Sequence, residues 1–273
     1  SVKQSERVPE LDGLRGIAIG LVLLHHTLSP VPALKPFFDM CWSGVDLFFV
    51  LSGFLLGGVL LDHKDAPNLL RVFYTRRVCR ILPLYFGLIA IYWLALQAPM
   101  PGFPPWAILF LGQPFVPVWS CLTFTQNFYV ATAGGLGATI ISSTWSLAVE
   151  EQFYLILPFF MRTLSGRWLP GLLVAGTLAA PLFRWACLHW NYPIATYVLL
   201  PCRADALLLG VLSAWLLRSP EWLKRFPFAA GWRAMLVLLA GTLALNGLWP
   251  DMLDFPMALW GHSWLALVYA GLV

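Results

Sequence analysis

Nine long apolar stretches, separated by short connectors, constrain the fold of this chain more than any other feature. They cover residues 16–34, 45–61, 81–98, 106–130, 146–161, 168–189, 200–217, 232–249 and 256–273. Hydrophobic residues make up 59% of the chain and charged residues only 11%, whereas soluble domains contain about 25% charged residues. Because a membrane-spanning helix needs about 20 mostly apolar residues, we predict a single all-α domain over residues 1–273, a polytopic bundle of transmembrane helices.

Eight of these stretches are predicted to span the bilayer, and the segment 106–130 is the exception. Pro114 and Pro117 interrupt it close to Gln126 and Asn127. A proline removes a backbone hydrogen-bond donor, and lipid offers no group to replace the lost bond. We therefore predict a non-spanning or re-entrant segment there, which leaves about eight spans.

The positions of the basic residues favour the same topology. If the segment 106–130 does not cross, 14 of the 17 Lys and Arg residues lie on the side of the N-terminus, but only eight do if it crosses. Since cytoplasmic loops carry an excess of Lys and Arg, we predict a cytoplasmic N-terminus. The net charge of +4 is small, and the Lys and Arg residues are mainly found in short connectors. Both observations argue against nucleic-acid binding.

The ends of the chain and its cysteines carry weaker signals. The sequence starts at Ser1 without an initiator methionine and stops at Val273 inside an apolar stretch, so we expect a fragment. The five cysteines form no Cys-x-x-Cys pair and lie in apolar surroundings. We therefore interpret them as small hydrophobic side chains.

Ionisable side chains within spans are costly and are candidates for function, and the first helix carries several. Arg15 and His26 are 11 residues apart, so they share one helix face and lie about 16 Å apart along the axis. Asp12 precedes Arg15 by three residues, which predicts an ion pair. If lipid begins near Ile17, His26 lies about 14 Å deep, near the bilayer midplane. The alternative for His26, and more so for His25, is a hydrogen bond to a neighbouring helix.

The second span begins with Asp46 and contains Gly53 and Gly57. The two glycines form a small-x-x-x-small face, which allows another helix to approach closely. Asp46 is interpreted either as a helix cap or as a functional group that orients a histidine or binds an acceptor hydroxyl.

A basic cluster, Arg76, Arg77 and Arg80, precedes the third span. Such a cluster is typical of a cytoplasmic interface that meets anionic lipid. The alternative is a site for the phosphates of a cytosolic substrate, because guanidinium groups bind phosphate in a bidentate manner.

Ser146, Glu150 and Tyr154 recur every four residues, so they form one stripe on a helix. Glu150 could pair with a histidine or accept a proton from an acceptor hydroxyl. The alternative reading of Glu150 and Glu151 is a pair of first-turn acids favoured by the helix dipole. Arg203 and Asp205, with Arg184 on the preceding helix, are interpreted mainly as a buried ion pair between two helices.

Four motifs occur in order along the chain. They are Leu-Asp-Gly-Leu-Arg-Gly at 11–16 followed by His26, Gly-Val-Asp-Leu-Phe-Phe-Val-Leu-Ser-Gly at 44–53, Phe-Tyr-x-Arg-Arg-x-x-Arg-x-x-Pro-x-Tyr at 73–85, and Thr-Trp-Ser-Leu-x-x-Glu-x-Gln-Phe-Tyr at 144–154. This combination resembles the acyltransferase-3 family of integral-membrane O-acyltransferases, over about residues 8–215. Members of that family carry acyl groups, usually acetyl, from cytosolic acyl-CoA to hydroxyls of surface sugars, peptidoglycan or small molecules.

The resemblance implies roles for individual residues. It implies His26 as the essential histidine, with Arg77 and Arg80 binding the donor. Arg76 and Tyr85 belong to the same donor motif, and Trp145 and Ser146 to the motif around Glu150. The family usually has about ten helices, so we expect the last spans to be missing here. It also implies a bacterial-type inner membrane, acyl-CoA as co-substrate, a glycan or other hydroxyl acceptor, and neither a bound cofactor nor a metal.

These residues suggest a path for acyl transfer. In this hypothesis the CoA phosphates are held at the cytoplasmic arginines and the thiol arm reaches His26, which acts as base or as acyl carrier. Glu150 or Asp46 would orient His26, and the acceptor would enter from the outer face. The alternative function is a transporter or flippase that uses the same intramembrane charges.

Overall fold

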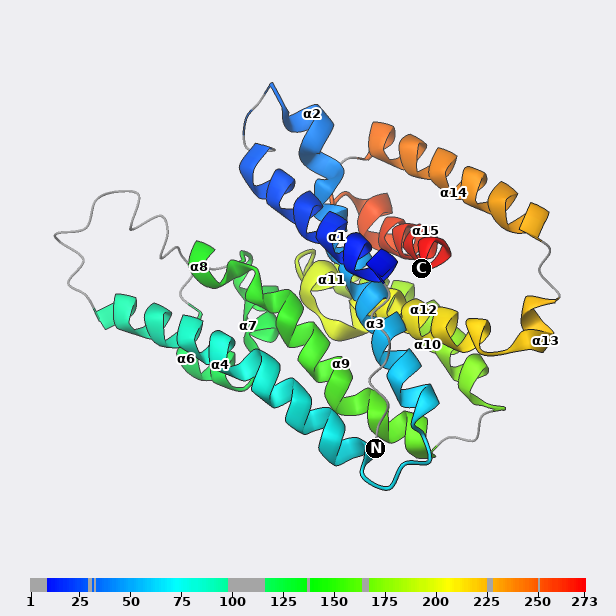
Figure 1. The fold of residues 1–273 in the computed structure, drawn as a ribbon. Coiled ribbons are helices and arrows are strands. Elements are labelled where there is room, and N and C mark those ends of the chain that lie inside the picture. The colour runs from blue at the N-terminus through cyan, green and yellow to red at the C-terminus, as the bar shows by residue number, and fades with distance from the viewer. Residues whose placement is uncertain are drawn as a thin grey trace. The chain divides into compact units, whose positions relative to one another are not determined.

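The computed structural model describes residues 9–28, 31, 33–97, 116–136, 138–163, 167–224, 228–249 and 251–273. Every regular element within these ranges is helical (Figure 1), as the apolar pattern predicts. The longer helices are α1 (Pro9–Leu28), α3 (Gly44–Asp62), α4 (Leu69–Gln97), α9 (Thr144–Thr163), α10 (Leu169–His189), α12 (Leu200–Leu217), α14 (Phe228–Leu248) and α15 (His262–Leu272). The short ones are α2 (Lys35–Phe38), η1 (Asp39–Ser43), α6 (Val118–Leu122), α7 (Gln126–Ala133), α8 (Thr139–Ser142), α11 (Ala195–Val198), α13 (Pro220–Leu223) and η3 (Met257–Gly261).

Four helical segments are long and apolar enough to cross a bilayer. They are Asp39–Asp62, Leu69–Gln97, Leu169–His189 and Ala195–Leu217, and each overlaps a predicted span. The structure therefore supports four of the eight predicted spans. Polar residues lower the hydropathy of α1 and α9, which carry Asp12 and Arg15, and Glu150 and Glu151, respectively. In α14 the apolar stretch is the shorter Arg233–Leu245, and α15 has 11 residues.

The segment 106–130 is described only from residue 116 onward. There it contains α6 with five residues and α7 with eight. At 1.5 Å per residue the longer of the two extends about 12 Å, whereas the hydrocarbon core of a bilayer is about 30 Å thick. Neither helix is long enough to cross, and residues 106–115 of the predicted non-spanning segment lie outside the described residues.

The chain forms two compact units. Unit 1 consists of Ser1–Gly58, Pro170–Leu178 and Asp205–Val273, and unit 2 consists of Val59–Leu169 and Ala179–Ala204.

In unit 1 the contact between α3 and α12 depends on glycine. A Cβ atom at Gly53 would collide with the backbone carbonyl of Leu207, and one at Gly57 would lie 3.0 Å from the Cα of Val211. On α12, a Cβ at Gly210 would collide with the carbonyl of Val50. The predicted small-x-x-x-small face is therefore confirmed, because only glycine allows the two backbones to approach this closely.

Helix α1 packs against the start of α3 in the same unit. A Cβ atom at Gly44 would lie 2.7 Å from the carbonyl oxygen of Ala18 and 3.1 Å from Cγ2 of Val22. Ala18 is buried together with Leu47 and Leu51. This contact fixes the second half of α1, which carries the two histidines.

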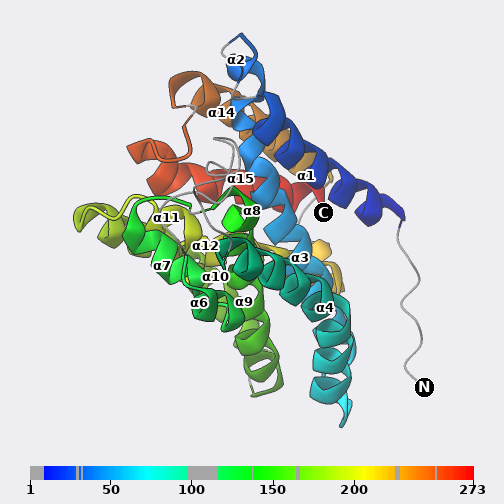
Figure 2. The same cartoon turned by 90° about the vertical axis from the view of Figure 1, so that its left-hand side faces the viewer.

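In unit 2 the short helices α6 and α7 lie beside α4 and α9 (Figures 1 and 2), and buried amides hold them there. Asn127 Nδ2 donates to Gln152 Oε1 at 3.3 Å, and Gln152 Nε2 donates back to Asn127 Oδ1 at 2.9 Å. Gln152 Nε2 also donates to the carbonyl of Phe124 at 2.7 Å. Asn127, one of the polar residues that interrupt the predicted segment, is thus hydrogen-bonded inside the protein, where lipid could not satisfy its amide.

Candidate functional site

The predicted ion pair at the start of α1 is present, with Arg15 Nη1 3.4 Å from Asp12 Oδ1. Two turns beyond Ala18, the ring of His26 is exposed, and its Nδ1 lies 2.8 Å from the carbonyl oxygen of Val22. A carbonyl oxygen only accepts, so Nδ1 carries the proton in this bond. In the neutral ring Nε2 is then the unprotonated nitrogen, which is the form of a base.

The neighbouring His25 lies differently. Its ring is 5.5 Å from that of His26 in an edge-to-face arrangement, and it is half-buried. Its buried Nδ1 has no hydrogen-bond partner among the described residues. Seven residues separate His25 from the buried Ala18, which places the two within about 20° on the helix. His25 therefore lies on the packed face of α1, and His26 lies about 80° away from it.

Asp46 occupies the first turn of α3 and is fully buried. It lies within electrostatic reach of Tyr269 on α15, whose hydroxyl is 2.7 Å from Ser43 Oγ. Close by in the chain, the ring of Trp42 is 5.2 Å from that of His262, which is also fully buried. Unit 1 thus contains a cluster of polar and aromatic side chains that joins the start of α3 to α15.

His262 and Tyr269 were not among the predicted site residues. His262 follows the π-helical turn η3 directly, and such turns are frequent at functional sites. The available signal was a histidine inside an apolar stretch.

In unit 2, Arg77 of α4 is enclosed by residues of α9. Its Nε donates to Glu151 Oε1 at 3.0 Å, and its Nη2 lies 4.0 Å from Glu150 Oε2. The guanidinium carbon is 3.2 Å from the centre of the Tyr154 ring, a cation–π contact. Glu150 thus contacts a predicted donor-binding arginine, and Glu151, which sequence reasoning left out of the site, makes the shorter contact. We refer to Arg77, Glu150, Glu151 and Tyr154 as the arginine clamp.

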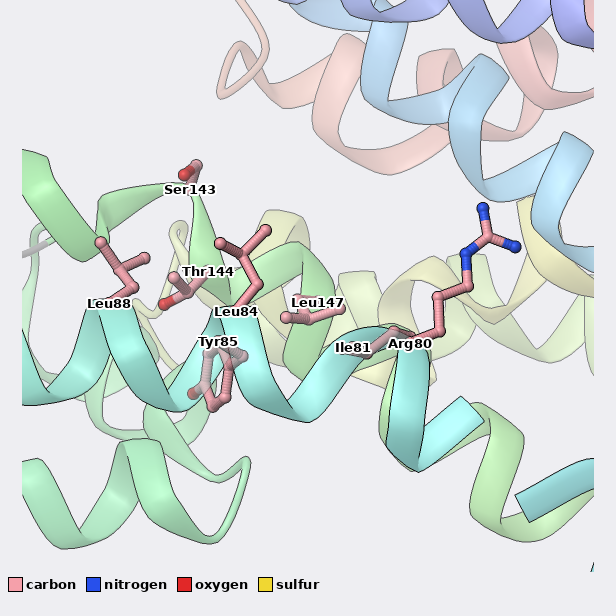
Figure 3. Close-up of a pocket in the computed structure, with 8 residues that line it drawn as sticks. All are labelled: Arg80, Ile81, Leu84, Tyr85, Leu88, Ser143, Thr144 and Leu147. Atoms are coloured by element: carbon pink, nitrogen blue, oxygen red, sulfur yellow. The ribbon is translucent and has the colours of Figure 1, made fainter. Parts of the chain in front are cut away.

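Next to the clamp, a groove of about 510 Å³ runs along α4. Its lining residues are Arg80, Ile81, Leu84, Tyr85, Leu88, Ser143, Thr144 and Leu147. Figure 3 shows Leu88, Leu84 and Leu147 spread along the groove, with Arg80 at the end opposite Leu88 and its guanidinium pointing away from the leucines. Arg80 is exposed, and among the described residues no carboxylate pairs with it. The groove therefore has a cation without a paired carboxylate at one end and a mainly apolar lining along the rest of its length.

Tyr85 is among the lining residues, and its hydroxyl has partners within the protein. The hydroxyl donates to the carbonyl of Cys121 at 2.8 Å and accepts from Gln126 Nε2 at 3.1 Å. The ring stacks on Phe124 at 4.6 Å, and Phe124 has a positive φ of 55°. Tyr85 thus fixes the turn between α6 and α7 behind the groove.

The other predicted supporting residues have individual contacts. Trp145 is buried with its ring 4.6 Å from that of Tyr197, over which the buried Arg203 also lies at 5.1 Å. Ser146 Oγ donates to the carbonyl of Ser143 at 3.0 Å. Arg76 is exposed on α4.

The residues of the predicted buried ion pair make the following hydrogen bonds. Buried Asp205 accepts from Ser263 Oγ at 2.5 Å and from the backbone N–H of Ala206 at 3.0 Å. Arg184 Nη1 donates to the carbonyl of Cys202 at 2.6 Å.

The structure therefore brings together Arg77 and Glu150 in the clamp, and Arg80 and Tyr85 at the groove, all within unit 2. His26 and Asp46 belong to unit 1. Among the described residues, no group of three or more His, Cys, Asp or Glu side chains is arranged as a metal site.

The chain matches a known protein family and several named proteins. The sequence model of the acyltransferase-3 family, described as an acyltransferase domain, matches residues 8–273. The chain is 30% identical over 167 residues to "Peptidoglycan O-acetyltransferase OatA" of Listeria monocytogenes, covering 56% of this chain and 24% of the relative. It is 31% identical over 171 residues to "Putative peptidoglycan O-acetyltransferase YrhL" of Bacillus subtilis, with coverage of 56% and 24%.

A third relative is "Putative O-acetyltransferase SACOL0978" of Staphylococcus aureus, 28% identical over 174 residues with coverage of 59% and 26%. The matched part of the chain spans about a quarter of the length of these relatives. No solved structure shows a significant match.

Proposed function

Because the chain belongs to the acyltransferase-3 family of integral-membrane O-acyltransferases, we propose that it transfers an acyl group, acetyl in the first instance, from acyl-CoA to a hydroxyl of an extracytoplasmic glycan. Relatives named as peptidoglycan O-acetyltransferases support a glycan acceptor. Family membership argues against the alternative of a transporter or flippase.

The observation that carries the donor side of this proposal is the groove on α4. Arg80, Leu84 and Leu88 follow one another at intervals of four residues, so they lie on one face over about 12 Å. Acyl-CoA is an elongated molecule with phosphates at one end and a largely uncharged arm that ends in the thioester. In the proposed complex Arg80 binds a phosphate, and the arm lies along the leucines toward Ser143.

Arg77 and Arg80 have different roles in this proposal. The guanidinium of Arg77 is held by Glu151 through Nε and by the face of Tyr154. Arg80 has no such partner among the described residues and is free to contact a ligand. Arg77 is therefore a positioning residue that fixes α4 against α9, and Arg80 is the residue that contacts the donor.

His26 is the proposed base. Its Nε2 takes the proton of the acceptor hydroxyl as the hydroxyl oxygen attacks the thioester carbonyl carbon. The new C–O bond forms, the C–S bond breaks, and the CoA thiolate receives the proton. In the second route Nε2 first attacks the thioester and carries the acyl group before the hydroxyl takes it. In the neutral ring, the bond from Nδ1 to the carbonyl of Val22 places the proton on Nδ1, so that Nε2 is the nitrogen with the free lone pair in both routes.

Asp46 of α3 is proposed to position His26 indirectly, because Nδ1 of the ring already donates to the carbonyl of Val22 and Nε2 is the base. Gly44, two residues before Asp46, packs on Val22, and the carbonyl of Val22 holds the His26 ring. Glu150 is assigned to the clamp instead, because its contact is to Arg77.

We further propose the finer topology: eight spans, a non-spanning segment 106–130 on the outer face, and a cytoplasmic N-terminus in a bacterial-type inner membrane. The distribution of Lys and Arg supports this orientation, which places the Arg80 end of the groove toward the cytoplasm. Reporter fusions after residues 135 and 165 test it: the first should report the outside and the second the cytoplasm. A cytoplasmic residue 135 would contradict the non-spanning assignment.

The test of the function uses membranes that contain the full chain and acetyl-CoA radiolabelled in the acetyl group. Label should pass to a glycan acceptor, and His26→Ala should abolish the transfer at unchanged protein level. The matched control is His25→Ala, one residue away on the packed face of α1, which should retain transfer. Normal transfer by His26→Ala would exclude His26 as the base. If the protein itself becomes labelled when the acceptor is absent, and His26→Ala does not, the reaction follows the acyl-histidine route.

A further inference from the structure

Two cysteines lie in contact where α10 ends and α12 begins in unit 2. Cys187 Sγ and Cys202 Sγ are 3.7 Å apart, although the residues are 15 positions apart in the sequence. A disulfide has an S–S distance of about 2.05 Å. The sulfurs therefore have to approach by about 1.7 Å to form the bond.

Other contacts hold the two residues near each other. The buried guanidinium of Arg184, on the turn before Cys187, donates to the backbone carbonyl of Cys202 at 2.6 Å. The backbone N–H of Tyr192 donates to the carbonyl of Cys187 at 2.8 Å. Between them, α11 is buried over its whole length. Hydrogen bonds and packing therefore already hold the two ends of the segment between Cys187 and Cys202 close together, as a disulfide would.

The two thiols differ in access, in the way that thiol–disulfide exchange requires. Cys187 is partly exposed, whereas Cys202 is 1% exposed. An external disulfide can reach the sulfur of Cys187 first. The buried Cys202, in contact with it, is then placed to complete the exchange.

We propose that Cys187 and Cys202 form a disulfide bond in the native membrane, at the extracytoplasmic ends of α10 and α12. The proposal rests on the orientation proposed above, because disulfides form and persist outside the cytoplasm. The oxidant is the disulfide of an extracytoplasmic thiol oxidase. The Cys187 thiolate attacks one of its sulfurs and gives a mixed disulfide. Deprotonated Cys202 then attacks Cys187 Sγ and releases the oxidase as its dithiol, so two electrons and, in balance, the two cysteine protons pass to the two sulfurs of the oxidase.

The test is differential alkylation of the full chain as it exists in cells. The cells are quenched with acid and free thiols are blocked with N-ethylmaleimide in denaturant, so that the buried thiol of Cys202 also reacts; after reduction the remaining cysteines receive the deuterated reagent. Mass spectrometry should find the heavy label on Cys187 and Cys202 and the light label on Cys79. Without reduction, a cross-linked peptide pair should appear with two hydrogen atoms fewer than the separate peptides.

Matched variants and a topology control separate the sources of failure. In Cys187→Ser, Cys202 should change to the light label, and a host that lacks the thiol oxidase should give light label on both. Light label on both cysteines of the unchanged protein in a normal host overturns the disulfide. A reporter fused after Trp190 then identifies the cause: a cytoplasmic signal means that the orientation is wrong, and an outer signal means that the pair stays reduced despite its location.

Discussion

Replacing Glu151 by Gln tests whether the arginine clamp fixes α4 against α9. The change keeps the size of the side chain but removes the charge that accepts from Arg77 Nε at 3.0 Å. Both side chains are mostly buried, with 20% of Arg77 and 18% of Glu151 exposed. A hydrogen bond between charged groups contributes about 1.5–3 kcal/mol. We expect the loss of stability to lie in the lower part of this range, because Glu150 stays 4.0 Å from Arg77 and partly replaces the lost charge.

A double-mutant cycle isolates this contact from other effects of the substitutions. Arg77→Gln, Glu151→Gln and the double variant are compared by unfolding of the purified protein in detergent. The two single changes should be non-additive by about 1.5–2 kcal/mol, which corresponds to a factor of more than ten in the unfolding equilibrium. The control cycle pairs Glu151→Gln with Arg80→Gln, which should be additive. Additivity in the first cycle, within about 0.5 kcal/mol, would refute the clamp as a stabilising contact.

Three further changes probe the groove, the helix contact and the amide pair. Arg80→Ala should raise the KM for acetyl-CoA about tenfold or more with little change in kcat, since one charged hydrogen bond to phosphate is lost; initial rates over a range of acetyl-CoA concentrations measure this. Gly53→Leu should prevent stable folding because its side chain collides with backbone on α12, whereas Gly87→Leu, with nothing within 4 Å, should be tolerated; detergent-soluble yield and melting temperature compare them. Gln152→Leu should destabilise the protein by about 1–3 kcal/mol for each buried group left unpaired, chiefly Asn127 Oδ1, because Asn127 Nδ2 keeps its bond to the carbonyl of Val198; chemical unfolding measures this.

Contacts that depend only on helix geometry could be predicted from the sequence. The Asp12–Arg15 pair follows from a spacing of three residues. The close approach at Gly53 follows from its spacing to Gly57, although nothing local indicated that α12 is the partner. Spacing within one helix is a local property, so these inferences did not need the tertiary structure.

Contacts between helices could not be predicted in the same way. Glu150 and Glu151 differ by about 100° in direction on α9, and only the placement of α4 decides which one meets Arg77. The periodic stripe favoured Glu150, whereas the shorter contact is to Glu151. The contact between Cys187 and Cys202 could not be predicted for the same reason, because their spacing of 15 residues corresponds to no local pattern.

The distribution of charge along α4 explains how the proposed donor site would select one orientation of acyl-CoA. The charge of Arg77 is neutralised by the clamp, and Arg80 is the exposed cation among the residues that line the groove. Beyond it the lining includes Leu84, Leu88 and Leu147, and moving an ionised phosphate into such surroundings is strongly unfavourable. The uncharged arm and its thioester meet no such barrier. On the proposed function, the groove therefore admits the reactive end of the donor and holds the charged end at Arg80, and the clamp contributes by keeping a second cation from competing for the phosphate.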